Sequence, residues 1–272
     1  TTSQPYDLAL EWLNGDGKRW RPFLLTAVYK ALTGEENTPE EVRKAAIAVE
    51  CFHKASLVHD DIQDKDMVRY GKPTVNAVHG DAIAINIGDM LLGEGYRLLA
   101  ECEHKELVAA IAKAHVSLCE GQGAELAWTA AFRLQSESAA NALPLTREFV
   151  LDIFRNKTVP AFGVALELGL ICADSNDLAL KGILAEYSEA IGIAYQIRDD
   201  LDDYVEDNEK AHRPSIVLAV KTEHEDWKKD EIVCEVERMI AEYTRKAQDI
   251  VEKIEIVELK RLLMLVNGKI LG

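Results

Sequence analysis

The chain has 272 residues, of which 48% are hydrophobic, so it is long enough to bury a sizeable core. Its formal net charge of -16 at pH 7 argues against nucleic acid or an anionic membrane surface as the main partner. An anionic substrate would therefore need metal ions and a local basic patch to bind.

The cysteine count and the apolar runs bear on the compartment. The five cysteines are odd in number and contain no CxxC pair, which favours reduced thiols over disulfides or a zinc site. No apolar run reaches the roughly 18 residues that a membrane-spanning helix needs. We therefore expect a cytoplasmic protein without a membrane span.

The hydrophobic pattern predicts one helix after another, with little strand-like alternation and no hairpin signal. Thr38 is expected to cap the third helix, and Pro160 is expected to kink a later one. The predicted helices are 1–13, 23–33, 41–64, 82–100, 104–128, one starting at 146, 176–203, 228–256 and 257–270. We therefore expect one all-α domain over residues 1–272, a bundle of roughly ten mostly antiparallel helices.

Two acidic helix turns stand out in this pattern. Asp60 and Asp64 are four residues apart, so they share one face of a helix, and Asp199 and Asp203 repeat the spacing. Like charges this close repel unless a cation lies between them, and carboxylate oxygens suit Mg2+. One acidic turn is usually a solvated surface. Two copies, each after an apolar helical run, predict magnesium-binding carboxylates instead.

Basic and polar groups accompany the two acidic turns. They are the Lys18–Arg21 segment, Arg69, the pair Lys157-Thr158, and Gln196 just before the second acidic turn. Carboxylates hold Mg2+, Mg2+ holds a diphosphate, and lysines and arginines neutralise the remaining charge. The combination predicts binding of one diphosphate by the acidic turns and of a second by nearby basic residues.

These motifs, in this order, resemble those of the trans-isoprenyl diphosphate synthases, the polyprenyl synthetase family. The resemblance runs from about residue 8 to residue 220 and is far more specific than a single DDxxD. It is carried by Gly17-Lys18-x-x-Arg21-Pro22, Asp60-Asp61-x-x-Asp64, Gly88-Asp89, Gly121-Gln122 and Tyr195-Gln196 followed by Asp199-Asp200-x-x-Asp203.

The resemblance implies the isoprenoid synthase fold, in which antiparallel helices surround a deep central cavity with both aspartate motifs at its mouth. It also implies a homodimer that binds three Mg2+ ions together with its substrates. The implied reaction is chain elongation, in which an allylic diphosphate condenses with isopentenyl diphosphate to a longer all-trans prenyl diphosphate.

Residue roles follow from the same resemblance. The implied catalytic set is Asp60, Asp61, Asp64, Lys157, Asp199, Asp200 and Asp203, in which Asp60, Asp64 and Asp199 ligate Mg2+. The implied contacts of the allylic diphosphate are Lys157, Arg69, Thr158 and Gln196. The implied contacts of the isopentenyl diphosphate are Lys18, Arg21 and His53, with Tyr70 at a further contact position.

Product length is expected to depend on Ala55 and Phe52, five and eight residues before Asp60. In the family that the chain resembles, bulky side chains at these positions close the pocket for the growing tail. Ala55 is small, so it sets no short limit, whereas Phe52 lies about one helical turn deeper. We therefore expect products of about C15–C25, closest to C20, with Phe52 as the stop.

The chain departs from the family pattern in two places. Arg69-Tyr70-Gly71 stands where Arg-Arg-Gly is usual, and the lost charge-assisted contact is expected to cost about 1.5–3 kcal/mol. The segment Tyr204–His212 is short and lacks the usual lysine-bearing Gly-Lys loop, for which Lys210 is a candidate substitute.

Two alternatives remain open from the sequence. A class I terpene cyclase shares the first aspartate motif, but its Asn/Ser/Glu metal motif does not occur at residues 199–203. A non-elongating binding or regulatory subunit is favoured by Tyr70 and the short segment. The two complete aspartate motifs and Lys157 favour the elongating enzyme over both.

Overall fold

The computed structural model describes residues 4–135, 145–205 and 213–270, which are almost entirely helical. The predicted all-α class is confirmed. Two compact units can be distinguished: a first unit of Thr1–Ile111 and Ala165–Ser175, and a second unit of Ala112–Val164 and Asn176–Gly272. The single domain over residues 1–272 stays a prediction.

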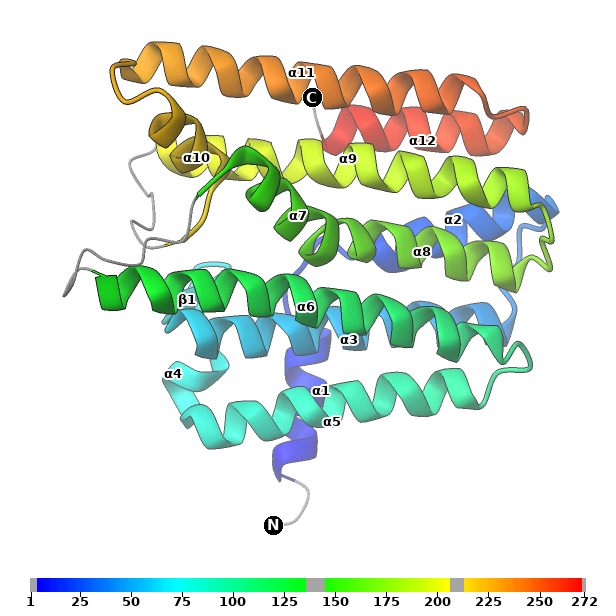
Figure 1. Ribbon diagram of the computed structural model, residues 1–272. Helices are drawn as coiled ribbons and strands as arrows, with labels where there is room; N and C mark the ends of the chain where they lie inside the picture. Colours follow the sequence, from blue (N-terminus) through cyan, green and yellow to red (C-terminus); the bar gives the residue numbers. More distant parts are fainter. Residues whose placement is uncertain (1–3, 136–144, 206–212, 271–272) are drawn as a thin grey trace. The chain divides into compact units, whose positions relative to one another are not determined.

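The first unit is built around two antiparallel helices, α3 and α5, which lie side by side (Figure 1). Its helices are α1 (Gln4–Asn14), α2 (Trp20–Thr33), α3 (Glu40–Asp64), α4 (Val75–His79) and α5 (Asp81–Ala100). Small and aliphatic side chains let the helices approach closely, and a buried cluster joins Ala9, Cys51, Ala55, Ile87 and Leu91. This packing fixes α3, which carries the first aspartate motif at its end.

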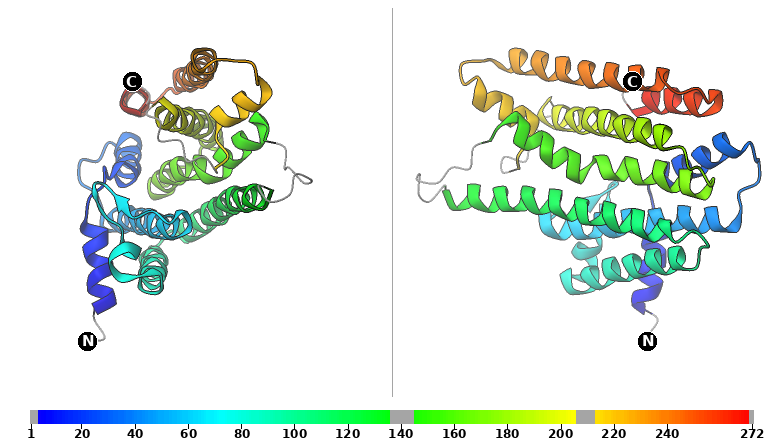
Figure 2. Two further views of the ribbon diagram at one scale, coloured as in Figure 1. Left: turned by 90° about the vertical axis from the view of Figure 1, so that its left-hand side faces the viewer. Right: turned by 45° about the vertical axis from the view of Figure 1, so that its right-hand side comes forward.

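The second unit is built around α9, which carries the other aspartate motif. Its helices are α7 (Arg147–Lys157), α9 (Leu178–Val205), α10 (Ile216–Glu223), α11 (Lys229–Glu252) and α12 (Val257–Ile270). Helices α6 (Glu106–Gln135) and α8 (Val159–Cys172) each have residues in both units. Helix α11 runs antiparallel to its neighbours α9 and α12, as the right-hand view of Figure 2 shows, and a large apolar cluster joins α7, α9, α10 and α11.

The start of α3 differs from the prediction. Pro39, not Thr38, is the N-cap residue, and no side chain caps the helix. The carbonyl of Thr38 accepts a hydrogen bond from the Arg43 side chain instead. Hydroxyl caps do occur in the second unit, where Thr146 accepts from the Phe149 N–H and Ser215 accepts from the Leu218 N–H.

A short hairpin follows α3, although no hairpin was expected from the sequence. Strands β1 (Val68–Arg69) and β2 (Lys72–Pro73) pair antiparallel across a two-residue turn. Tyr70 and Gly71 in this turn have φ values of 54° and 73°, which matches the mirror-image turns that connect tight hairpins. Strands of two residues are too short to show an alternation of apolar and polar residues. The turn residues Tyr-Gly also differ from the usual Asn-Gly signature.

The kink expected at Pro160 is a complete break between two helices. Helix α7 ends at Lys157 and α8 begins at Val159, so Pro160 lies in the first turn of the new helix. Proline there has no N–H to donate and clashes with the carbonyl four residues earlier, which prevents one continuous helix. Lys157 and Thr158 therefore lie at a helix junction.

Candidate functional site

The middle aspartate of the first motif is buried and held by an arginine. The Asp61 side chain is 1% exposed, and its Oδ1 accepts a hydrogen bond from Nε of Arg69 at 2.7 Å and forms an ion pair with Nη2 at 2.7 Å. Burial raises the pKa of Asp61, and the Arg69 guanidinium opposes that shift. The hairpin turns the chain back so that Arg69 reaches α3. Asp60 and Asp64, on one side of α3, stay partly exposed.

Two predicted contacts of the isopentenyl diphosphate, Arg21 and His53, lie near each other. Burial, and then the charges of Arg21, Lys54 and Arg69, lower the pKa of His53 to about 2. His53 is therefore neutral at pH 7, and its imidazole can donate to a phosphate oxygen without bringing a charge. The structure thus places Arg21 and Arg69 within electrostatic reach of His53, and Lys18 is exposed in the loop before α2.

Arg19 has a structural role that the sequence did not reveal. Its guanidinium donates to the Glu50 carboxylate at 2.9 Å and to the carbonyls of Leu13 and Gly15 at 2.7 and 2.8 Å. Arg19 thereby fastens the loop between α1 and α2 to α3. The signal in the sequence was Glu50, an acid one helical turn before His53 on a largely apolar helix.

The two residues assigned to product length, which are three apart on α3, both pack against α5. Ala55 is fully buried in the cluster with α1 and α5. Phe52 packs edge-on against Tyr96, with 4.8 Å between ring centroids, and fills a notch at Gly95. A Cβ on Gly95 would lie 2.6 Å from the Phe52 ring. The role of both residues in product length stays a prediction.

The middle aspartate of the second motif is held by the backbone. Oδ2 of Asp200 accepts a hydrogen bond of 2.7 Å from the N–H of Ile216, the first residue of α10. Burial raises the pKa of Asp200 to about 7. Burial, and then the charge of Asp203, raise the pKa of Asp199. Asp199 and Asp203 are thus coupled, as their spacing predicted.

Each motif offers a pair of carboxylates to a cation. Among the described residues, no three side chains of His, Cys, Asp or Glu come together as a ready metal site. A carboxylate pair still fits Mg2+, because this ion usually keeps several waters and takes phosphate oxygens as further ligands. Burial and then repulsion from Asp203 raise the pKa of Asp199, and a bound cation would relieve that repulsion.

A buried glutamate, not noticed in the sequence, joins two cations in the second unit. Glu125 of α6 is 7% exposed. Its Oε2 accepts from Nζ of Lys157 at 2.8 Å, and its Oε1 accepts from Nε and Nη2 of Arg213 at 2.8 and 2.6 Å. Burial alone would raise the pKa of Glu125, but the charges of Lys157 and Arg213 outweigh burial and lower it. Two cations thus lie on opposite sides of one carboxylate.

Gly121 brings Glu125 to this position. A Cβ on Gly121 would lie 2.6 Å from the backbone nitrogen of Lys157, so only glycine lets α6 approach α7 this closely. Glu125 follows one helical turn later on the same face of α6. Close packing of α6 on α7 therefore explains the glycine of the Gly121-Gln122 pair.

A chain of polar contacts connects the α7–α8 junction to the second motif. The Thr158 hydroxyl donates to Oε1 of Gln196 at 2.8 Å, and Nε2 of Gln196 lies 3.4 Å from Oδ2 of Asp199. Three predicted site residues are thus brought together within this unit.

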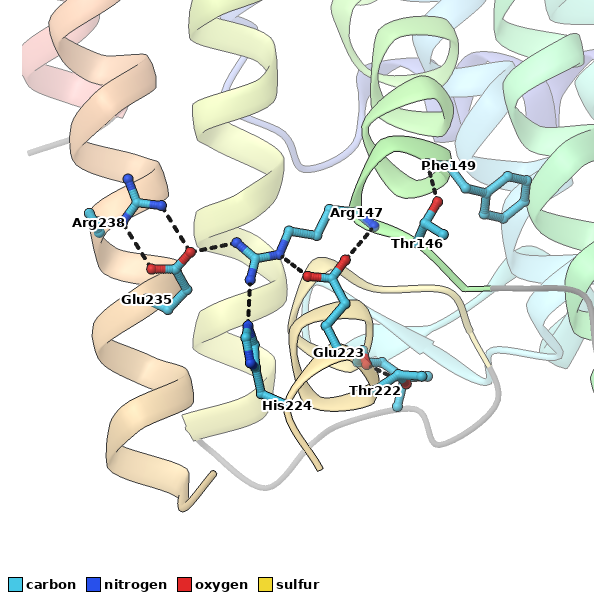
Figure 3. A network of polar contacts seen from close by, with 9 residues as sticks. Thr146, Arg147, Phe149, Thr222, Glu223, His224, Glu235 and Arg238 are labelled. Carbon is cyan, nitrogen blue, oxygen red and sulfur yellow. Dashed lines mark hydrogen bonds and ion pairs between the residues drawn. The ribbon is translucent and has the colours of Figure 1, made fainter. Parts of the chain in front are cut away.

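A network of ion pairs fixes the helices that carry this group (Figure 3). Arg147, at the start of α7, donates to Glu223 of α10 at 2.6 Å and to Glu235 of α11 at 2.5 Å. Its Nη2 also lies 3.2 Å from the His224 ring. Arg238 contacts Glu235 from the other side, and the two arginines lower the pKa of Glu235 to about 2. Helices α7, α10 and α11 are thereby held together.

Part of the predicted arrangement cannot be placed. Lys210, the candidate substitute for the missing loop lysine, lies outside the described residues, as does most of Tyr204–His212. The predicted contacts of Lys18, Tyr70 and Arg69 with substrate diphosphates stay predictions. No helix of the described residues is long and apolar enough to cross a membrane.

The chain matches the sequence profile of the polyprenyl synthetases over residues 4–218. It is 31% identical over 269 residues to a short chain isoprenyl diphosphate synthase of Methanocaldococcus jannaschii, a match that covers 93% of this chain and 76% of that protein. It is 36% identical over 191 residues to a farnesyl diphosphate synthase of Haemophilus influenzae, with 69% and 62% covered. A geranylgeranyl diphosphate synthase of Saccharolobus solfataricus is 32% identical over 206 residues, with 73% and 57% covered. The matches thus span less than two thirds of the last two relatives.

Solved structures share the fold. A geranylgeranyl pyrophosphate synthetase from Geoglobus acetivorans superposes with a TM-score of 0.79 at 23% identity, over 98% of this chain and 92% of that one. A geranyltranstransferase from Thermotoga maritima gives a TM-score of 0.76 at 22% identity, over 98% and 89%.

Proposed function

The chain belongs to the polyprenyl synthetase family, a family of prenyltransferases, and from this premise we propose that it is a Mg2+-dependent, chain-elongating enzyme. It would condense an allylic diphosphate with isopentenyl diphosphate and release diphosphate. The product would be an all-trans prenyl diphosphate of about C15–C25, closest to C20 if Phe52 closes the tail pocket.

The observation that carries this proposal is the cationic pair of Lys157 and Arg213 on Glu125, next to the contacts that join Thr158, Gln196 and Asp199. A diphosphate needs several cationic donors and an adjacent carboxylate set for its metal ions. Both lie within the second unit. A carboxylate that already holds the two cations in place also keeps them ordered before the substrate arrives.

Asp60, Asp64 and Asp199 would hold the metal, with Asp203 beside Asp199. When bound, Mg2+ would neutralise the departing diphosphate and so ease cleavage of the allylic carbon–oxygen bond. Lys157 would stabilise the charge that develops on the same group. The other residues of the chain act by binding and orientation, and no covalent nucleophile is required.

The first unit would bind isopentenyl diphosphate through Lys18, Arg21 and the neutral His53. The double bond of this substrate attacks the allylic carbocation, and a proton is then lost to the departing diphosphate. The protein supplies position, positive charge and exclusion of water. Function as a homodimer in the cytoplasm is part of the proposal and rests on the family alone.

The direct test is incubation of the purified protein with Mg2+, isopentenyl diphosphate and, in turn, dimethylallyl, geranyl or farnesyl diphosphate. Elongated diphosphates in the mass spectrum support the proposal. Hydrocarbon products would indicate a terpene cyclase instead. No turnover with any primer, together with Mg2+-dependent diphosphate binding, would indicate a non-elongating subunit.

Phe52→Ala tests the assignment of product length in the same assay. The variant should give longer products than the wild type, because removal of the ring opens the notch at Gly95. Phe23→Ala is the matched control, since Phe23 is an exposed phenylalanine on α2 of the same unit and should leave the product distribution unchanged.

A further inference from the structure

The first unit contains a completely buried lysine that the proposed mechanism does not use. Lys54 of α3 is 0% exposed. Its Nζ donates to the carbonyl of Asp16 and lies 4.8 Å from the ring centroid of Trp12 and 5.6 Å from that of Tyr70. A buried ammonium is costly unless such partners replace its water. An uncharged side chain would fill the same space without that cost, so the charge itself needs an explanation.

Lys54 braces the loop that carries Lys18. A Cβ on Gly17 would lie 3.5 Å from Nζ of Lys54 and 4.0 Å from the hydroxyl of Tyr70. Asp16 is fixed twice, because its carbonyl accepts from Lys54 and its carboxylate pairs with Lys72 of the hairpin at 2.6 Å. The loop before Lys18 thus rests directly on Lys54 and Tyr70.

Tyr70, which departs from the family pattern, contacts the same lysine that supports the loop before Lys18. Tyr70 occupies the place where a second arginine is usual, and its ring lies over the Lys54 ammonium. A guanidinium at residue 70 would lie beside that ammonium and repel it. The aromatic ring attracts it instead. The charge absent from residue 70 is therefore present a few ångströms away, on α3.

We propose that Lys54 is a positioning residue for the isopentenyl diphosphate: its buried ammonium fixes the Gly15–Lys18 loop and supplies the positive charge that Tyr70 lacks. The proposal rests on the proposed function for the identity of that substrate. It predicts that either Lys54 or an arginine at residue 70 is enough for binding of isopentenyl diphosphate. It also predicts that a protein with both is less stable than a protein with one of them.

The experiment compares wild type, Lys54→Met, Tyr70→Arg and the double variant, with elongation kinetics and thermal unfolding measured for each. Lys54→Met should raise KM for isopentenyl diphosphate about tenfold or more, as expected for loss of a charge-assisted interaction, with KM for the allylic substrate unchanged. Lys44→Met is the matched control, because Lys44 lies on the same helix ten residues before Lys54 and pairs with Glu101. It should leave both KM values unchanged.

The double variant separates positioning from simple packing. Adding Tyr70→Arg should restore KM for isopentenyl diphosphate to within about threefold of wild type when Lys54 is absent, but should lower the melting temperature when Lys54 is present. If Lys54→Met alone does not fold, a folded double variant with near wild-type KM supports the proposal. A double variant no better than Lys54→Met, or equal effects on both KM values, overturns it.

Calorimetric titration of isopentenyl diphosphate keeps this test separate from the proposed function. A wild-type protein that binds this ligand but elongates no primer would contradict the proposed function only. The proposal for Lys54 then stands if Lys54→Met weakens binding about tenfold and the double variant restores it. Equal affinity in wild type and Lys54→Met would overturn it.

Discussion

The two acidic motifs follow the same five-residue pattern but hold their middle aspartates with different partners. In the first unit, the buried carboxylate of Asp61 accepts a hydrogen bond from the Arg69 guanidinium and forms an ion pair with it. In the second unit, Asp200 accepts from the uncharged N–H of Ile216. Two cations of the second unit, Lys157 and Arg213, are bound to Glu125 and not to the motif.

The difference shows that one motif can serve two electrostatic arrangements. Burial raises the pKa of both middle aspartates. The Arg69 guanidinium opposes this shift at Asp61. At Asp200 the main opposing contact is the N–H of Ile216, and the pKa rises to about 7. The outer aspartates of both motifs keep the same spacing, so the metal-binding part of the pattern does not depend on how the middle residue is held.

The outer aspartates should show the largest effect on activity. Asp60→Asn and Asp199→Asn should each lower kcat by about 10²–10³-fold, because each removes charge aimed at the metal ions and the leaving group. Steady-state kinetics and thermal unfolding measure both effects. Asp202→Asn is the control within the second motif, since Asp202 is exposed and does not share the i, i+4 face. A comparable loss in Asp202→Asn would contradict the assignment.

Asp61→Asn should be the most destabilising change of the motif carboxylates. The asparagine can still accept a hydrogen bond, but Arg69 loses its counter-charge, at a cost of about 1.5–3 kcal/mol. Urea unfolding at neutral pH without divalent ions measures this cost. A stability equal to that of the wild type would show that solvent, not Asp61, compensates Arg69.

Glu125→Gln probes the different placement of cations in the second unit. Without the carboxylate, Lys157 and Arg213 repel each other, so the unfolding free energy should fall by about 1–3 kcal/mol. Added inorganic diphosphate with Mg2+ should then raise the melting temperature more than it does for the wild type. An equal ligand-induced rise in both proteins would show that Glu125 does not compete with the ligand.

Asp200→Asn should stabilise the folded protein at neutral to alkaline pH, whereas Asp61→Asn should destabilise it. The pKa of Asp200 is raised to about 7 from 3.8, so the folded state binds its proton more tightly than the unfolded state. Its contribution to stability is full below about pH 4 and is lost as the pH rises through about 7. The variant should therefore melt about 2–4 °C higher at pH 8 without divalent ions, and the difference should vanish near pH 4. A lower melting temperature at pH 8 would contradict this.

Glu235 is a carboxylate outside both motifs. Its substitution by glutamine should have the smallest effect on stability among these variants. Its pKa is lowered to about 2 from 4.5, so its contribution is present above about pH 4.5 and is lost as the pH falls through about 2. Solvent screening around the exposed Arg238 limits the contribution to about 1 kcal/mol. Glu235→Gln should lower the melting temperature at pH 7 by a few degrees and have no effect near pH 2, as followed by circular dichroism.

Local spacing predicted the parts of the structure that depend on one helix. The spacing of the outer aspartates and most helices follow from residues close together in the chain, whereas the kink predicted at Pro160 is a break between two helices. The contacts of the buried charges do not, because Glu125 and Arg213 are 88 residues apart and Lys54 and Asp16 are 38 apart. Such contacts depend on how helices pack. The Tyr70-Gly71 turn was missed for a different reason, since its strands are too short to carry a pattern.

The contact between Phe52 and Gly95 makes the order of substitutions important. With Phe52 present, Gly95→Ala would place a methyl group 2.6 Å from the phenyl ring, so that step is blocked until the ring is reduced. Phe52→Ala meets no such barrier and makes later growth at residue 95 tolerable. The order of substitutions at this pair therefore matters in evolution. A larger side chain at residue 95 of α5 is tolerated only after residue 52 of α3 has become smaller.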